Sequence, residues 1–356
     1  MNTNRLRNSN IEFLRIVSML FITLHHFSLW SRGGVADTLI ANNQLLRAFY
    51  SLFYLPLGDI GVYAFVMITG YYLGSKEYDE KRTLKKAVSI YAQLYFYSIL
   101  FLLVAIYLKM PLKGNYSIWK SIMPLTFNHY WFVTAYILLM LFVPYINKAV
   151  ANLSRNRFIY LLVILIASCS IFPLINNNVA SESVGLGILI TAYLVGLYIR
   201  KFVKKSNWNY LIGLALFVVN LVIIYGKMYY DIVFSKNRYT NIYTGFFALI
   251  CSLGLFLIFI TFKTRFNSMI NQIAKHMFAV YLITENIFVL TKMWNHFTFS
   301  NTENLIKMNL YGFVAVLGIM VICYFADIGR SIIFKIIAFV FHRHKTSKNE
   351  VPIKIN

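Results

Sequence analysis

The sequence predicts an all-α integral membrane protein with about ten transmembrane helices and both termini in the cytoplasm. Of its 356 residues, 59% are hydrophobic and only 13% are charged, whereas about a quarter of the residues in a typical globular protein are charged. The apolar residues form runs of about 17 to 23 residues, the length that a helix needs to cross the hydrocarbon core. The basic residues are distributed unevenly between the loops of the two sides. We therefore expect a multi-pass protein of the plasma membrane, solvated mostly by lipid.

The expected helices follow one another with short connections. We place them at residues 11–30, 52–74, 87–108, 130–147, 158–175, 184–199, 209–225, 241–262, 276–293 and 309–327. The apolar stretch 331–341 lies between basic residues, so we expect it to continue the last helix along the membrane interface. The membrane domain then covers residues 1–341, and residues 342–356 form a basic cytoplasmic tail.

The distribution of Lys and Arg supports both the number of helices and their orientation. With ten spans, the loops and span ends on the amino-terminal side carry 23 of the 34 Lys and Arg residues, the opposite side carries 10, and Arg15 lies inside the first span. By the positive-inside rule, the amino-terminal side is cytoplasmic. The net charge of +22 is therefore mostly a consequence of topology. Because the basic residues form no single patch, we expect no nucleic-acid partner.

The first apolar segment contains two side chains that are unusual in a membrane helix, Arg15 and His26. Groups of this kind inside a bilayer usually have a functional role. Eleven residues at about 100° each complete three turns to within about 20°, so the two side chains share one helix face, roughly 16 Å apart along the axis. His25 points about 80° away from that line. His26 is therefore the candidate for chemistry.

Further motifs accompany this pair along the chain. Glu12 precedes Arg15 by one turn in IEFLRIVSMLFITLHHF. The second span carries small and aromatic residues in GDIGVYAFVMITGYYLG, namely Gly58, Gly61, Phe65, Thr69 and Gly70. The basic stretch KEYDEKRTLKK follows it. The segment NHYWFVTAYILLMLFVP contains Trp131, Phe132, Tyr136 and Pro144, and the ninth span contains MFAVYLITEN.

Taken together, these motifs resemble those of the bacterial integral-membrane acyltransferase-3 family, many of whose members O-acetylate cell-surface polysaccharides. The resemblance covers residues 11–145 and 276–286, while the fifth to eighth spans match only in hydropathy. One position departs from the family pattern. Many members have a histidine two residues after the leucine of the Tyr-Leu motif, where this chain has Thr284. We expect the adjacent Glu285 to supply part of the missing polarity.

The resemblance implies an O-acyltransferase that takes an acyl group, expected to be acetyl, from cytosolic acyl-CoA. The expected acceptor is a hydroxyl of a surface polysaccharide or of its lipid-linked precursor. A neutral imidazole is suited to take the hydroxyl proton near pH 7, and it can alternatively accept the acyl group itself before passing it on. The sequence leaves both routes open. The catalytic candidates are His26, Arg15 and Glu12, with Glu12 expected to pair with Arg15.

The donor and acceptor each have candidate binding residues. If acyl-CoA enters from the cytoplasm, Arg82, Lys85 and Lys86 are placed to hold its phosphates, and its pantetheine arm would pass Arg15 to bring the thioester to His26. The candidate acceptor residues are Trp131, Tyr281 and Glu285. Acyl-CoA is a donor substrate, and no tightly bound cofactor is expected. The three cysteines lie in apolar runs without metal-ligand spacing, so no metal site is predicted.

Simpler interpretations remain open for each of these residues. Arg15 could be a snorkelling anchor, and His26 could be a polar residue packed between helices. The basic stretch could reflect only topology, and Trp131 could belong to an interfacial aromatic belt. A different class of function is also open, a transporter or flippase that uses Arg15, His26 and Glu285 as a substrate or proton relay. A transporter should show helix-breaking Gly or Pro in paired halves. The prolines show no mirrored pattern, which favours the enzyme.

Overall fold

The structure, a computed structural model, describes residues 8–74, 79–110, 114–175, 184–235, 245–297 and 304–349. Within these ranges the regular structure is entirely helical, with no strand. The two π-helical segments are Phe27–Ser31 (η1) and Ala167–Ile171 (η2). The α-helices are Ser9–His26 (α1), Arg32–Ala41 (α2), Leu45–Ser51 (α3), Leu57–Leu73 (α4), Glu80–Tyr107 (α5), Gly114–Ile122 (α6), Trp131–Val150 (α7), Arg155–Ile166 (α8), Phe172–Ile175 (α9), Val184–Phe202 (α10), Asn207–Phe234 (α11), Phe246–Thr261 (α12), Ser268–His276 (α13), Phe278–Thr284 (α14), Ile287–Asn295 (α15) and Leu305–Asn349 (α16).

Among the described residues, seven helical segments are long and apolar enough to cross a membrane. They are Ser9–Ser31, Glu80–Tyr107, Trp131–Val150, Arg155–Ile175, Gly185–Phe202, Asn207–Phe234 and Asn309–Val340. Helices α4 and α12 are apolar but shorter, and Ser268–Thr284 with Ile287–Asn295 forms a pair bent by 72°. The protein is therefore an all-helical, multi-pass membrane protein. Every expected span overlaps one of these helical segments, but the span expected as one helix at 276–293 is broken, and the second begins at Leu57 instead of residue 52.

Helix α4 lies at the centre of the bundle, packed against α1, α10 and α12. Its glycines permit this close packing. A Cβ atom on Gly61 would lie 2.5 Å from the Ser18 carbonyl oxygen of α1, and one on Gly70 would lie 1.9 Å from the Tyr193 carbonyl oxygen of α10. Gly196 of α10 approaches the Met67 carbonyl oxygen of α4 in the same way. Backbones in contact at this distance accept no side chain, so these glycines set the positions of α1 and α10 relative to α4.

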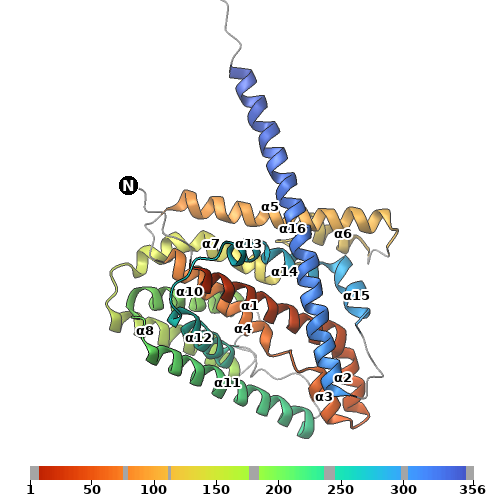
Figure 1. Cartoon of the computed structure of the whole chain (residues 1–356), viewed down its shortest axis with the longest axis vertical. Coiled ribbons are helices and arrows are strands. Elements are labelled where there is room, and N and C mark those ends of the chain that lie inside the picture. The colour runs from red at the N-terminus through yellow and green to blue at the C-terminus, as the bar shows by residue number, and fades with distance from the viewer. Residues whose placement is uncertain are drawn as a thin grey trace, which may run out of the picture.

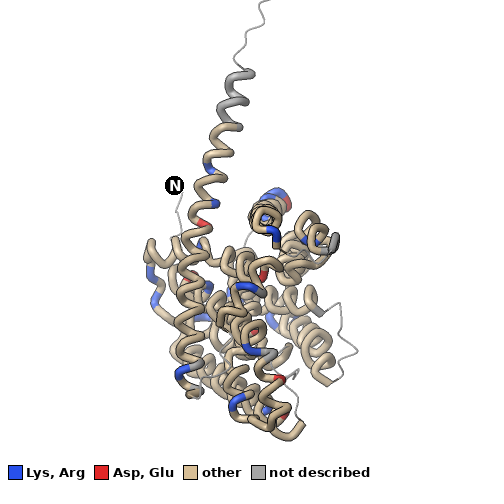
Figure 2. The backbone as a smooth tube through the Cα atoms, turned by 90° about the vertical axis from the view of Figure 1, so that its right-hand side faces the viewer, with Lys and Arg blue, Asp and Glu red and all other residues tan. Residues whose placement is uncertain are grey.

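The helices run in two main directions (Figure 1). Helices α1 and α10 each lie beside α4, α11 packs along α12, and the long α16 crosses this group and extends beyond the rest of the molecule. Basic residues are scattered along the chain instead of forming one patch, and acidic residues are few (Figure 2). The expected tail at 342–356 begins as a continuation of α16, and its residues 350–356 lie outside the described residues.

A buried polar cluster joins three helices that are far apart in the sequence. Asp327 of α16 accepts hydrogen bonds from Tyr97 and Gln93 of α5, each at 3.0 Å. It also lies 2.6 Å from His276 Nδ1 at the end of α13 and 2.5 Å from Arg330 Nε. Asp327 and Arg330 form a pair three residues apart on α16. The structure shows that this pair also ties α16 to α5 and α13.

Candidate active site

The site is centred on His26, the last residue of α1, which is buried against α14. Its Nε2 atom lies 3.2 Å from Glu285 Oε1, and its Nδ1 atom lies 3.4 Å from the Thr284 hydroxyl. The two ring nitrogens of His26 therefore face two consecutive residues, Thr284 at the end of α14 and Glu285 directly after it. Glu285 was expected to replace a missing polar group near this point, and the structure makes it the direct partner of His26. A carboxylate on one nitrogen of an imidazole stabilises the imidazolium that forms when the other nitrogen takes a proton.

A π-helical turn continues α1 directly after His26. Segments of this kind often occur at functional sites. Trp30 lies one turn beyond His26, and its indole Nε1–H donates a hydrogen bond of 2.8 Å to Glu285 Oε1. His26 and Trp30 thus hold the same carboxylate oxygen. The indole remains 42% exposed, so one side of the pair opens to the surface.

The carboxylate lies at the break between α14 and α15, and neighbouring groups stabilise that break. The Asn286 side chain caps α15 by accepting from the Phe288 backbone N–H, and its Nδ2 donates 2.8 Å to the Tyr130 hydroxyl. Tyr130 in turn donates to the Leu282 carbonyl oxygen. The backbone N–H of Ile287 donates to His129 Nε2. The two residues that precede α7 therefore satisfy backbone groups on both sides of the bend.

Two more residues complete the surroundings of His26. The His25 ring lies 5.8 Å from that of His26, but its Nδ1 is hydrogen-bonded to the Leu55 carbonyl oxygen at 2.6 Å, consistent with its expected different direction. Tyr281, an expected acceptor residue, is buried with its ring 5.8 Å from that of His26. Its hydroxyl finds no hydrogen-bond acceptor among the described residues. A buried hydroxyl without an acceptor is uncommon in a native structure.

The other two catalytic candidates, Arg15 and Glu12, form a separate pair. Arg15 Nη1 lies 2.5 Å from Glu12 Oε2, and its guanidinium lies over the Phe65 ring at 5.8 Å from the centroid. The expected pairing of Arg15 with Glu12 is thus present in the structure. Along α1, Arg15 lies about 16 Å from His26, so this pair does not contact the groups that surround Glu285.

The remaining expected residues lie outside this cluster. Arg82, Lys85 and Lys86 are exposed on the first two turns of α5, a helix capped by Asp79, and no described hydrogen bond joins them to Arg15 or His26. The part of the basic stretch at 75–78 lies outside the described residues. Trp131 begins α7 with a 42% exposed ring that packs beside Phe132. The described residues contain no group of three or more His, Cys, Asp or Glu side chains that could hold a metal ion.

A bundle of membrane-length apolar helices around a buried histidine–carboxylate pair defines a multi-pass membrane protein with a site suited to proton transfer. The family model described as an acyltransferase domain matches residues 8–327. The chain belongs to this acyltransferase-3 family and is a membrane acyltransferase. Comparisons with curated proteins and with solved structures gave no match.

Sequence reasoning missed the roles of Trp30, Asn286 and His129. Two of them had a weak signal in the sequence. Trp30 lies four residues after His26, a spacing that places it on nearly the same helix face. Asn286 precedes an apolar run, as a helix cap does. His129 gave no comparable signal, because its contact with Ile287 joins positions 158 residues apart.

Proposed function

We propose that this membrane acyltransferase transfers an acetyl group from cytosolic acyl-CoA to a hydroxyl of a surface polysaccharide or of its lipid-linked precursor. The observation that carries the proposal is the buried pair of His26 and Glu285. Transfer from a thioester to a hydroxyl needs a base at the point where the two substrates meet. A histidine oriented by a carboxylate is such a base, and it lies within the family domain at residues 8–327.

In this proposal, His26 Nδ1, the ring nitrogen that is not bonded to Glu285, takes the proton of the acceptor hydroxyl, which replaces the long 3.4 Å contact of Nδ1 with the Thr284 hydroxyl. The hydroxyl oxygen attacks the thioester carbon, a C–O bond forms, and the C–S bond breaks. The departing CoA thiolate then takes the proton from the imidazolium. Glu285 stabilises the imidazolium between these steps, while Trp30 keeps the carboxylate in place through its indole N–H. General-base catalysis of this kind contributes about 10²- to 10⁴-fold to a rate.

The thioester carbonyl needs a hydrogen-bond donor as negative charge develops on its oxygen. We assign this role to Tyr281, because its hydroxyl is buried, has no described acceptor, and belongs to a ring in contact with that of His26. Trp30 and Trp131, each with an exposed ring, are available for the sugar of the acceptor.

The donor is proposed to enter from the amino-terminal end of the bundle. Arg82, Lys85 and Lys86 at the start of α5 are exposed and can meet the phosphates of CoA. The separation of about 16 Å between Arg15 and His26 along α1 matches the reach of a pantetheine arm. Within the bundle, Arg15 is paired with Glu12, and such a partner offsets part of the cost of burying a guanidinium.

The proposed route requires the amino-terminal end to face the cytoplasm. We propose ten spans with both termini in the cytoplasm, supported by the overlap of every expected span with a helical segment and by the excess of Lys and Arg on one side. Reporter fusions at residues 152, 205 and 265 should indicate the cytoplasm, and fusions at residues 44 and 126 should indicate the outside. The reverse pattern would place the proposed entry route for acyl-CoA on the outer side of the membrane, where it could not receive a cytosolic donor.

The acyl-transfer proposal is tested on purified surface polysaccharide by proton NMR. Cells that lack the gene are complemented with the wild type or with His26→Ala at matched membrane abundance. We expect an O-acetyl signal with the wild type alone. Equal ester content in all strains would overturn the polysaccharide as acceptor. Membrane vesicles supplied with [¹⁴C]acetyl-CoA should transfer label to glycan in a His26-dependent way, and no transfer from this donor would overturn the assignment of acyl-CoA.

A further inference from the structure

A groove next to the proposed site has the properties of a lipid-binding site. It lies between the last turn of α5 and the face of α15, with a volume of about 310 Å³, close to the lower limit for ligand pockets. Its lining is almost entirely apolar and includes Phe101, Leu108 and Met110 from the α5 side and Phe288 and Met293 from α15. Met side chains adapt readily to a flexible apolar chain.

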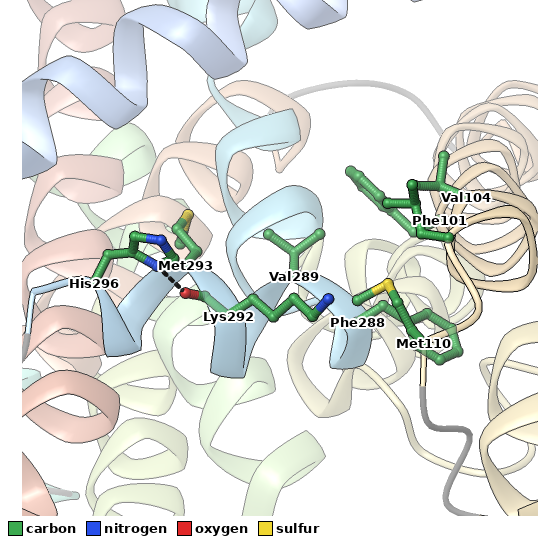
Figure 3. Close-up of a pocket in the computed structure, with 9 residues that line it drawn as sticks. Phe101, Val104, Met110, Phe288, Val289, Lys292, Met293 and His296 are labelled. Atoms are coloured by element: carbon green, nitrogen blue, oxygen red, sulfur yellow. Dashed lines mark hydrogen bonds between the residues drawn. The ribbon is translucent and has the colours of Figure 1, made fainter.

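One positive charge, that of the exposed Lys292, borders this apolar lining. Phe288, Lys292 and His296 are spaced four residues apart and therefore share one face of α15. The Lys292 side chain extends along that face toward Phe288 and Met110 (Figure 3). No carboxylate forms an ion pair with Lys292 within the described part of the chain. An ammonium group against an apolar wall is stabilised by an anion, and Lys is a frequent phosphate ligand.

The groove is also close to the reacting groups. Phe288 follows Glu285 by only three residues, so their Cα atoms are at most about 11 Å apart. Asn286 joins the two by capping α15 through the Phe288 N–H. The opposite face of α15, which carries Trp294, packs against Phe27 of η1. Thus α15 has the site on one side and the groove on the other.

We infer that this groove binds the polyprenyl phosphate carrier of the acceptor, with the hydrocarbon chain against the apolar lining and the phosphate on Lys292. The inference rests on the proposed function, because it makes the lipid-linked precursor the acceptor. The apolar chain of such a lipid matches the apolar lining of the groove, and its anionic headgroup matches the ammonium group of Lys292. Lys109, between the lining residues Leu108 and Met110, adds a second positive charge at the same end of α5. Because Lys292 extends toward Phe288, a carrier bound in this way would bring its sugar to the start of α15, the end of the helix where Glu285 lies.

The test measures binding of undecaprenyl phosphate to the purified full-length protein by native mass spectrometry. We expect Lys292→Gln to weaken binding by roughly tenfold. Lys307→Gln is the matched control, because Lys307 is an exposed lysine at the start of α16 that does not line the groove. It should bind as the wild type does. Undecaprenol, which lacks the phosphate, should bind like the Lys292→Gln variant, and an equal concentration of phosphatidylglycerol should not displace the probe.

Equal affinity of wild type and Lys292→Gln would overturn the inference, and so would displacement by phosphatidylglycerol, which would make the groove a site for bulk lipid. The His26→Ala variant separates this inference from the proposed function. It should retain undecaprenyl phosphate binding and lose acyl transfer. If the wild type transfers no acyl group but binds the probe through Lys292, the proposed function fails while the groove assignment stands.

Discussion

Apart from His26, Glu285 is the residue on which the proposed chemistry depends most directly. Glu285→Gln preserves the shape of the side chain but removes the charge that stabilises the imidazolium, so acyl transfer should fall by about 10²-fold or more. The measurement is the initial rate of acyl transfer in membrane vesicles that contain equal amounts of wild-type or variant protein and a saturating concentration of acyl-CoA. Asp37→Asn, at an exposed carboxylate on α2, is the control and should leave the rate unchanged. A Glu285→Gln variant as active as the wild type would exclude Glu285 from catalysis.

Trp30 acts through Glu285 and is therefore a positioning residue. Trp30→Phe keeps an aromatic ring but removes the indole N–H that binds Glu285 at 2.8 Å. A hydrogen bond to a charged group contributes about 1.5–3 kcal/mol, so kcat should fall by about tenfold to hundredfold. The KM for acyl-CoA should stay unchanged, because in the proposed route its pantetheine arm does not contact the hydrogen bond between Trp30 and Glu285. Trp208→Phe, at an exposed Trp on α11 that has no part in the proposed site, should leave kcat unaltered, and equal kcat values in both variants would argue against the positioning role.

At the scale of single elements, the contact of α4 with α10 depends on glycine. Gly70→Ala would place a Cβ 1.9 Å from the Tyr193 carbonyl oxygen, so α10 must move away, at a cost of about 2 kcal/mol or more. Gly226→Ala in α11 is the control, since a Cβ there meets no atom within 4 Å, and Ala favours a helix by about 0.5–1 kcal/mol. Thermal unfolding in detergent should show a lower Tm for the first variant only. A Tm for Gly70→Ala at or above that of the wild type would contradict the close packing.

The break between α14 and α15 should respond to pH through His129. Burial lowers the pKa of His129 from 6.5 to about 4, and the charge of Lys120 lowers it as well, while the hydrogen bond to the Lys120 carbonyl oxygen opposes this shift. In its neutral form the ring binds the Lys120 carbonyl oxygen through Nδ1 and accepts the Ile287 N–H through Nε2. The unfolded chain therefore binds the proton first as pH falls, and His129 contributes a loss of stability between about pH 6.5 and about pH 4. His129→Gln can make both hydrogen bonds without titrating. Its Tm should fall less than that of the wild type between pH 7.5 and pH 5, and parallel curves would contradict this account.

At the scale of the whole molecule, the sequence predicts the helical class, the approximate helix positions and the shared face of Arg15 and His26. These features depend on composition and on a period within one helix. The partner of His26 is 259 residues away along the chain, and no local pattern indicates which acidic residue reaches it. The bend at Glu285 was also missed, because the apolar run continues through it and the groups that satisfy the free backbone come from the residues before α7. The sequence thus named both His26 and Glu285 as candidates, but it indicated neither their contact with each other nor the residues that position them.

Asp327 shows the same dependence on distant contacts, and it also holds the longest helix in place. Its four partners lie on α5, α13 and α16. Asp327→Asn would leave Arg330 and His276 without a buried carboxylate, so unfolding free energy should fall by about 3 kcal/mol. Asp231→Asn is the control, because Asp231 pairs only with Lys227 on its own helix among the described contacts, where such a pair contributes about 0.3–0.5 kcal/mol.

Two measurements distinguish loss of α16 docking from a general loss of stability. Tm in detergent should fall further for Asp327→Asn than for Asp231→Asn, and trypsin should cleave more rapidly at the exposed Lys335 only in the former. Because α5 carries the basic residues proposed for the donor, release of α16 from α5 should also raise the KM for acyl-CoA. Unchanged cleavage at Lys335 with a normal KM would mean that packing between apolar faces, and not the Asp327 cluster, holds α16 against the bundle.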